Sequence, residues 1–422
     1  MARTWTNWAR DQRCAPERIE RPADEAELAR AVAGATRVKV VGAGHSFTDI
    51  ACTDGTMVEL SGMKRLLAVD GNEVTVQAGI TIRELALALA ERDLALENQG
   101  DVDAQTLAGA ICTATHGTGA RFQNVSGQVV RMGLVTADGS IVELREGDDL
   151  LAGRVSLGAL GAIASVTLRC VPAFTIRRAD EPRPLDDVLS RFDEHVDSND
   201  HFELFVFPYT RTALTLTSER TDEAANPPGR AAAFTRDVLL ENAALGVACR
   251  AGRLVPGAIP GINRLVTGMI SRAEQLDASH RVYANRRLVR FTEMEYAVPR
   301  ASVPEALERV LALVERRRLP VGFPVEVRVV AADDALLSTA QGRPTGYIAV
   351  HQYRGMEFES YFRAVEAIMD EYGGRPHWGK RHYQTAATLR PRYPGWDRFM
   401  AVRERMDPAR KFGNEYLRRV LG

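Results

Sequence analysis

A glycine loop near the amino end is the first stretch whose residue types suit chemistry. Residues 38–41 are three valines and a lysine, and residues 42–46 read Gly-Ala-Gly-His-Ser. β-Branched residues favour a buried strand. Glycines let the backbone turn tightly and approach a ligand closely, because no Cβ intervenes. Successive exposed N–H groups in such a turn can hold a phosphate, although a lone Gly-x-Gly is a weak signal.

The glycine loop lacks the motif of nicotinamide dinucleotide enzymes. That motif needs a third glycine and then a helix, whereas residues 47–55 have the composition of a loop. The acidic residue that would bind a ribose is also not in place. The sequence therefore argues against a nicotinamide-dependent dehydrogenase.

A second chemical pattern is Glu326-Val327-Arg328, inside a valine-rich run over 325–331 that predicts a strand. Residues two apart in a strand share one face, so the carboxylate and the guanidinium point to the same side. Charges on strands often form a plain solvated pair. If this pair is buried, each group supplies the partner that the other requires.

Residues 107–120 form a run of small and hydroxyl-bearing residues. Such a run cannot fill a core with its own bulk, and it suits a surface against which a flat body packs closely. Close packing of a helix or strand is the alternative interpretation.

The apolar periodicity predicts an α+β chain in two parts, with no internal repeat. In the first part we expect helices over 22–32 and 81–94, strands over 38–41, 73–79 and 164–170, and a hairpin over 129–144. In the second part we expect strands over 202–207, 213–216, 325–331 and 346–351, and helices over 304–317 and 360–372. Residues 218–235 are predicted to be a mobile excursion. The boundary is expected near Pro172.

Composition bounds the class of protein and its compartment. The 422 residues carry 54 basic and 55 acidic side chains, so no general field attracts nucleic acid or an anionic membrane. Five scattered cysteines without a CxxC pair indicate neither a disulfide framework nor a metal site. The most apolar stretch, 238–255, is interrupted by charges and predicts a buried or partly buried helix rather than a membrane span. We expect a cytoplasmic protein.

Three separated motifs carry a family resemblance. Residues 40–54, 114–119 and 374–380, in this order, resemble the aldonolactone oxidases, FAD enzymes of the vanillyl-alcohol-oxidase superfamily. The tail over 406–414 fits the same family. The resemblance covers nearly the whole chain and is weakest over about 175–300. The alditol oxidases share the three motifs and are the nearest rivals.

The resemblance implies an α+β fold of two domains. Residues 1–172 would form an FAD-binding domain with two small subdomains. Residues 173–422 would form a substrate domain whose antiparallel sheet covers the flavin. The segment over about 377–422 would pack back on the FAD domain.

The resemblance also assigns cofactor-binding residues. His45 matches the histidine that carries FAD covalently; the alternative is a histidine that only hydrogen-bonds the loop or a phosphate. Gly100 matches a small residue beside the reactive edge of the flavin, where glycine admits oxygen; the alternative is a turn glycine. The implied cofactor-binding residues are Val41, Gly42, Ala43, Gly44, His45, Ser46, Gly100, Asp101, Thr106, Gly109, Thr113, Thr115, His116, Gly117, Thr118, Ile163 and His377.

The implied reaction is oxidation of a sugar-1,4-lactone of the L-gulono-1,4-lactone type at the C2 hydroxyl, by hydride transfer to flavin N5. Glu326 would receive the hydroxyl proton, Arg328 would position the substrate, and Lys380 would stabilise negative charge. His351 matches a site histidine of alditol oxidases. Oxygen, a quinone or a cytochrome would accept the electrons. The alternatives are an alditol oxidase that produces hydrogen peroxide and a noncatalytic flavoprotein.

Overall fold

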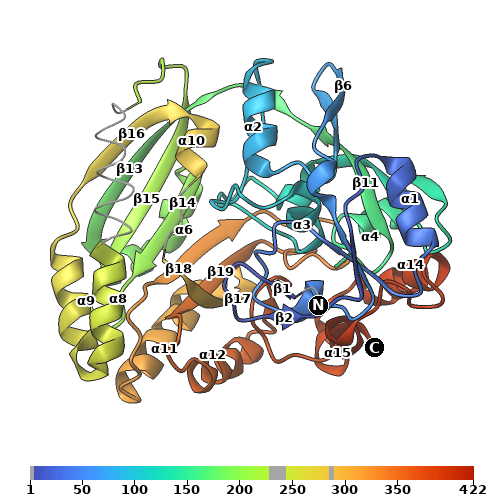
Figure 1. The fold of residues 1–422 in the computed structure, drawn as a ribbon. Helices are drawn as coiled ribbons and strands as arrows, with labels where there is room; N and C mark the ends of the chain where they lie inside the picture. The colour runs from blue at the N-terminus through green and yellow to red at the C-terminus, as the bar shows by residue number, and fades with distance from the viewer. Residues whose placement is uncertain (1–3, 228–243, 285–288) are drawn as a thin grey trace.

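The protein is built around two large hydrophobic cores, and each core is formed by both helices and strands. The computed structural model describes residues 4–227, 244–284 and 289–422, and Figure 1 shows how their elements are arranged. One core gathers residues from Leu28 to Cys170 together with residues from the carboxyl end, among them Trp378 and Leu421. The other lies between a large sheet and its helices. The predicted α+β class is confirmed.

The first core begins with a small parallel sheet in the order β3-β5-β4, formed by Arg18–Glu20, Thr56–Glu59 and Val38–Val41. Helix α1, Glu25–Ala33, connects β3 to β4, and its first turn is capped because Asp24 accepts a hydrogen bond from the Glu27 amide. The glycine loop therefore starts at the carboxyl end of a strand.

A five-stranded antiparallel sheet completes the first core, in the order β10-β9-β11-β7-β6. Its strands are Ile141–Leu144, Val129–Val135, Ala162–Arg169, Glu73–Gln77 and Leu66–Asp70. The predicted hairpin is β9 and β10, which pair from Val135 opposite Ile141 to Met132 opposite Leu144.

Helix α2, Ile82–Ala90, begins at the expected Thr81 but ends before the predicted Leu94. A capping box fixes its start: Thr81 accepts from the Glu84 amide and Glu84 accepts from the Thr81 amide. At the other end Asp93 has a φ of 54°, which a helix cannot contain. Leu94–Ala95 then forms strand β8, paired with β12, Val171–Pro172.

The second core is organised by an eight-stranded sheet in the order β16-β13-β15-β14-β18-β19-β17-β20, in which every neighbouring pair is antiparallel. Its strands are, in that order, Ala273–Ala278, Thr175–Pro184, Thr212–Thr221, His201–Val206, Val325–Val330, Thr345–Tyr353, Phe291–Pro299 and Arg375–Pro376. Helices α11, Val303–Arg316, and α12, Glu359–Glu371, cover one face (Figure 1).

Alternation along the central strands separates apolar from polar side chains. On β18, Val325, Val327 and Val329 enter the helix-covered core. Glu326 and Arg328 therefore point to the opposite face. Strands β14, β17 and β19 follow the same rule, so polar side chains of four strands meet above the first core.

Several predictions for the second part were wrong or incomplete. Strands β13, β16 and β17 were missed; in β13, TIRRADEPRP, the many charged residues hide the alternation of a strand. Residues 218–221 of the predicted excursion belong to β15, and residues 228–235 lie outside the described residues. The helix predicted over 238–255 is described as α8, Ala244–Leu254, and it is partly buried: Cys249 enters a core cluster, whereas Val247 and Leu254 are exposed.

The remaining elements are short or peripheral. The other strands are β1 (Trp5–Thr6) and β2 (Arg13–Cys14), and the other α-helices are α3 (Leu107–Cys112), α4 (Gly147–Gly153), α5 (Leu185–Ser190), α6 (Phe192–Asp197), α9 (Ile259–Gly268), α10 (Ser279–Tyr283), α13 (Ala386–Leu389), α14 (Trp396–Met406) and α15 (Glu415–Leu421). Among the described residues, no helix has the length and apolar character needed to cross a membrane.

Candidate active site

A long cleft lies between the first core and the polar face of the large sheet. Its volume, taken to the open mouth, is about 1530 Å³. One wall is the glycine loop with residues 100–102, α3 and residues 157–163. The other wall comes from β17, β18, β19 and residues 377–380. The cleft thus brings together segments separated by more than half of the chain.

The glycine loop meets helix α3 with no space for a side chain. A Cβ on Gly42 would lie 1.9 Å from the Oγ1 of Thr106, the residue that caps α3 by accepting from the Gly109 amide. No acceptor among the described residues takes the amide hydrogens of residues 43–46, whereas the Phe47 amide donates to Gly379 O at 2.7 Å. These amides are available to a ligand in the cleft.

His45 lines the cleft beside an aromatic wall. Its ring stacks on Trp8 with centroids 5.4 Å apart and planes 20° apart. Burial lowers the pKa of His45 to about 4, against the opposing effect of Asp103. The imidazole is therefore neutral near pH 7, with a nitrogen lone pair available.

Lys39 is buried at the other end of the cleft and has no carboxylate within ion-pair distance in the described part of the chain. Its Nζ lies 3.4 Å from Phe412 O and 3.5 Å from Leu157 O, both long contacts. Burial lowers the pKa of Lys39 to about 7. A buried amine with only weak contacts fits an acceptor supplied by a ligand.

The pair predicted on β18 is buried and in direct contact. Glu326 Oε1 lies 2.6 Å from Arg328 Nε, and the side chains of Glu326 and Arg328 are 7% and 8% exposed. Arg328 also contacts Glu203 at 2.9 Å and Asp101 at 3.5 Å. Its guanidinium therefore serves three carboxylates. Burial opposes the charge of Arg328, but these carboxylates outweigh it and raise its pKa.

A second charged group surrounds Lys380. Its Nζ lies 2.6 Å from Glu293 Oε1 and 3.0 Å from Glu295 Oε2. Burial disfavours the charges, but the mutual attraction outweighs it, so the pKa of Lys380 is raised and that of Glu293 is lowered to about 2. Lys380 is thus a held cation at one end of the cleft.

His351 connects the two charged groups. Its Nε2 lies 3.4 Å from Glu293 and 3.9 Å from Glu326, while Nδ1 lies 3.1 Å from Pro324 O. Because a carbonyl only accepts, Nδ1 carries the proton in that contact. Nε2 is then the nitrogen that faces the carboxylates.

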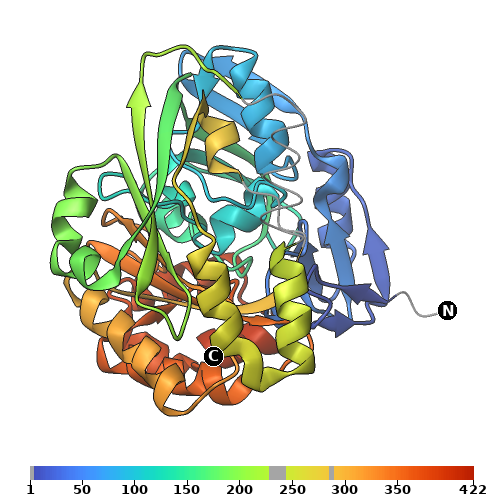
Figure 2. The ribbon, with the colours of Figure 1, turned by 90° about the vertical axis from the view of Figure 1, so that its left-hand side faces the viewer.

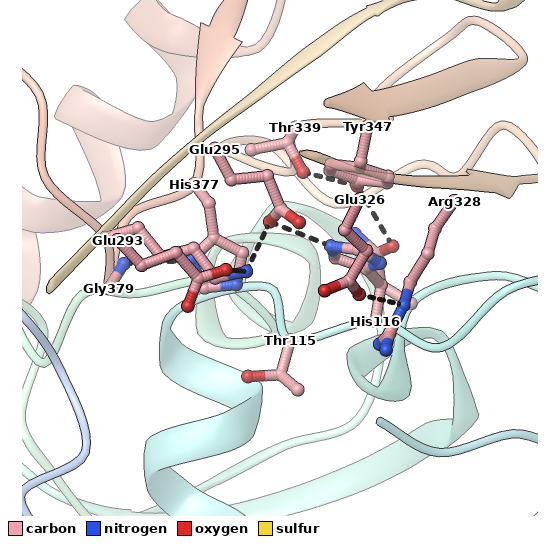
Figure 3. A network of polar contacts seen from close by, with 12 residues as sticks. Thr115, His116, Glu293, Glu295, Glu326, Arg328, Thr339, Tyr347, His377 and Gly379 are labelled. Carbon is pink, nitrogen blue, oxygen red and sulfur yellow. Dashed lines mark hydrogen bonds and ion pairs between the residues drawn. The ribbon is translucent and has the colours of Figure 1, made fainter. Parts of the chain in front are cut away.

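His116 joins the first core to the polar face of the sheet. Its Nδ1 lies 2.9 Å from Gly117 O and its Nε2 lies 3.0 Å from Glu295. Burial opposes the charge of Glu295, but Lys380 and His116 outweigh it and hold its pKa well below the usual range. Both ring nitrogens of His116 therefore face acceptors. The ring also stacks on Tyr347 with centroids 3.5 Å apart (Figure 3).

His116, Glu295 and His377 offer ligand atoms that lie within 4.8 Å of one another. Lys380 already supplies a cation to this group through its contact with Glu295. Burial lowers the pKa of His377 to about 3, and the positive charge of Lys380 contributes to the same shift. The contacts of the group are thus explained by the chain's own residues, and the sequence-based expectation of no metal site stays a prediction.

The structure gathers nearly all predicted site residues around the cleft. The four residues with predicted catalytic roles line it. The predicted cofactor-binding residues line it too, except Gly117 and Thr118. A Cβ on Gly117 would meet Asn98 Oδ1 and Gln99 O at 2.4 Å, and Thr118 Oγ1 accepts from the Val329 amide. Both lie at a smaller cavity beside Arg328.

Sequence reasoning missed four charged residues of the site: Lys39, Glu203, Glu293 and Glu295. The two glutamates of β17 had a usable signal, because residues 293–296 (Glu-Met-Glu-Tyr) alternate charged and apolar in the manner of 326–329 (Glu-Val-Arg-Val). Lys39 and Glu203 had none. Each stands in an ordinary strand, and only the packing of distant segments buries it.

Comparison with known proteins defines the class first. A family model described as an FAD binding domain matches residues 16–145. Solved structures of cholesterol oxidase, including that from Brevibacterium sterolicum, share the fold with a TM-score of 0.82 over 100% of this chain and 97% of theirs, at 17% identity. The protein is therefore an FAD-binding flavoprotein with the fold expected for the vanillyl-alcohol-oxidase superfamily.

The family follows from the second half of the chain and from full-length relatives. The model of the D-arabinono-1,4-lactone oxidase family matches residues 166–420. The chain is 58% identical to L-gulono-1,4-lactone dehydrogenase of Mycobacterium tuberculosis over 100% of both chains. It is 36% identical to L-gulonolactone oxidase of Bos taurus, over 98% of this chain and 97% of the relative. The chain belongs to the aldonolactone oxidase family, and the predicted family is confirmed.

Proposed function

We propose that this protein oxidises a sugar-1,4-lactone of the L-gulono-1,4-lactone type at its C2 hydroxyl, giving an ascorbate-type product. The observation that carries the proposal is the convergence of Glu326, Arg328 and Lys380 on one end of a cleft that starts at the glycine loop. The names of the relatives from Mycobacterium tuberculosis and Bos taurus support this substrate class.

The cleft fits FAD on two observations. The amides of residues 43–46 lack an acceptor within the described chain, as a pyrophosphate site requires. Gly42 and Gly100 have no free space for a Cβ, which on Gly100 would lie 3.0 Å from His116 O. Bound FAD supplies a hydride acceptor at N5. We assign Lys39 to the adenosine end, where Ile163 also lines the cleft.

The charged residues then divide the work on the substrate. Arg328 positions the hydroxyl and is itself held by Glu203 and Asp101. Glu326 pairs with Arg328 through Oε1. Its Oε2 is left to receive the hydroxyl proton, while hydride leaves the same carbon that bears the hydroxyl. Lys380 places positive charge where negative charge develops. Glu326 and Arg328 are buried, Lys380 is half-buried, and all three are held by ion-pair partners, so little reorganisation is needed during the reaction.

We further propose that His45 bonds covalently to the flavin. The bond needs a neutral imidazole nitrogen fixed near the ring, and burial keeps His45 neutral. Stacking on Trp8 fixes the ring plane. After acid denaturation, flavin fluorescence should stay with the polypeptide and should be lost from a His45→Ala variant. Release of free FAD from the unmodified protein would refute the bond.

The electron acceptor belongs to the same proposal. Gly100 lines the cleft without a side chain, which suits access of oxygen, while a quinone or cytochrome would also regenerate the enzyme. The division into residues 1–172 for FAD and 173–422 for the substrate, with 377–422 returning to the first core, is proposed on the composition of the two cores. A cytoplasmic location stays a prediction.

The decisive experiment is anaerobic reduction. Purified protein should be yellow and should bleach on addition of L-gulono-1,4-lactone. A Lys380→Met variant that still binds FAD should bleach far more slowly. A yellow protein that no lactone or polyol bleaches would overturn the proposed function.

An alditol oxidase is the second candidate. The chain is 32% identical to an alditol oxidase of Streptomyces over 100% of both chains. His351 is placed between Glu293 and Glu326, where a terminal hydroxyl could also be deprotonated. Faster bleaching by xylitol or sorbitol than by any lactone would favour this candidate.

A further inference from the structure

The hairpin of helices α8 and α9 exposes an unusual amount of apolar surface. Nine large apolar side chains are strongly exposed in the described chain, and five of them lie here. These five, the hairpin patch, are Val247, Leu254, Val255, Leu265 and Met269. Their exposed fractions run from 59% for Val255 to 78% for Leu254. Figure 2 shows the hairpin at the front of the molecule, on the side that faces the viewer.

The same hairpin is purely basic. Residues 244–272 contain four arginines, at positions 250, 253, 264 and 272, and no aspartate or glutamate. Arg272 pairs with Glu181 at 3.0 Å. The other three are exposed and pair with no carboxylate that the structure describes. In a chain with net charge −1, the hairpin that carries the apolar side chains thus also carries three exposed arginines.

The hairpin is a firmly packed part of the fold. A Cβ on Gly252 would lie 2.8 Å from Ile259, so the helices touch closely. Asn263 Nδ2 donates to Pro208 O and Val321 O, both at 3.0 Å. Cys249 is buried with Phe291 and Phe323 in the aromatic cluster beside the cleft. The outward apolar face thus belongs to an anchored element that no other described segment covers, and an exposed apolar patch of this kind marks an interaction surface.

We propose that the hairpin patch docks on an anionic lipid membrane surface. Helices that lie in a membrane interface combine an apolar face with arginines that meet lipid phosphates. Basic residues near such a surface strengthen binding, because the anionic lipid headgroups attract them. A second copy of the chain fits less well, because a two-fold contact places the same patch on both sides and brings arginines against arginines. The proposal does not depend on the substrate.

Vesicle sedimentation with the full-length holoprotein tests the proposal. The protein should pellet with vesicles that contain phosphatidylglycerol, pellet weakly with pure phosphatidylcholine, and be released by high salt. A Leu254→Asp/Met269→Asp variant should lose about tenfold or more in partitioning, because two apolar side chains no longer enter the interface. Arg250→Gln/Arg264→Gln should also weaken binding to the anionic vesicles.

The matched control is Leu87→Asp, on the exposed side of α2, which should bind as the unmodified protein does. Equal melting temperatures will show that the variants are folded. Failure to bind anionic vesicles, or binding unchanged by Leu254→Asp/Met269→Asp, would overturn the proposal. Self-association that this double variant abolishes, without vesicle binding, would instead identify a second copy as the occupant and overturn it as well.

Discussion

The two walls of the cleft are built by opposite means. The glycine loop and α3 present backbone amides and small residues, and Gly42 of the loop has no space for a Cβ. The sheet wall presents Glu293, Glu326, Arg328 and Lys380, all charged and paired. One wall is specified by the shape of its backbone and the other by the charge of its side chains.

The difference shows where each wall is vulnerable. A backbone wall tolerates changes of charge nearby but not added volume, because packed interiors do not yield by an ångström. A wall of buried ion pairs tolerates small changes of shape but not the loss of one partner, which leaves a buried charge unpaired. Substitutions on the two walls should therefore fail in different assays.

The largest effect is expected on the charged wall. Arg328→Met should lower kcat/KM with L-gulono-1,4-lactone by about a thousandfold, since three carboxylates lose their shared guanidinium. FAD content should change little. Arg328→Lys should lose less activity, because lysine keeps the positive charge although it lacks the planar set of guanidinium donors. Dye-linked turnover measures the effect, and activity within tenfold of the unmodified enzyme would contradict it.

On the backbone wall, Gly42→Ala should block cofactor loading. The new Cβ would overlap Thr106 Oγ1, and such overpacking costs about 1–3 kcal/mol or more. FAD per chain, read from absorbance, should fall. Adding Thr106→Ala should restore part of it, while Gly257→Ala, where nothing lies within 4 Å, should have no effect. If the Gly42→Ala variant bound a full complement of FAD, the loop would have shifted to accept the methyl group, and the prediction would be wrong.

Lys39 combines features of both walls, because it is a charged side chain on the wall that the glycine loop forms. In a His45→Ala background, Lys39→Met should weaken reversible FAD binding by about tenfold, as expected for loss of a charged hydrogen bond. Fluorescence titration of the apoprotein measures the affinity. An unchanged dissociation constant would make Lys39 a packing residue only.

Gly100 tests whether a small change of shape can alter the acceptor alone. A Cβ there would lie 3.0 Å from His116 O and 3.2 Å from Thr115 Cγ2. These contacts are tight, but small shifts of the neighbouring atoms can accommodate a methyl group. Gly100→Ala should lower oxygen consumption by about tenfold, a barrier change near 1.4 kcal/mol, and spare dye reduction. Equal loss in both assays would mean that the substrate step is affected instead.

The smallest effect is expected from Glu203→Gln. Burial raises the pKa of Glu203 to about 7, despite the opposing effect of Arg328. Its contribution to stability is therefore present below the unfolded value of about 4.3 and is lost as pH rises through 7. The stability of the Glu203→Gln variant should depend less on pH. Its melting temperature should therefore change between pH 5.5 and pH 8.5 by roughly 1–2 °C less than that of the unmodified protein. Parallel shifts in both proteins would refute this assignment.

Local patterns along the chain were sufficient for much of the fold. The capping box at Thr81, the hairpin at 129–144 and the glycine loop each depend on neighbouring residues, so the sequence alone predicts them. Three motifs sufficed for the family and the cofactor. Strand β13 was missed because its ion pairs, such as Arg178 with Asp180, lie along the strand and hide its period.

The site itself required the tertiary structure. Alternation on β18 predicts that Glu326 and Arg328 share a face, but the other two carboxylate partners of Arg328, Glu203 and Asp101, lie more than a hundred positions away in the sequence. Likewise, Lys39 is an unremarkable strand lysine until the segments at 157 and 412 bury it. Periodicity records which way a side chain points, whereas burial and charge pairing depend on which distant segments fold over it.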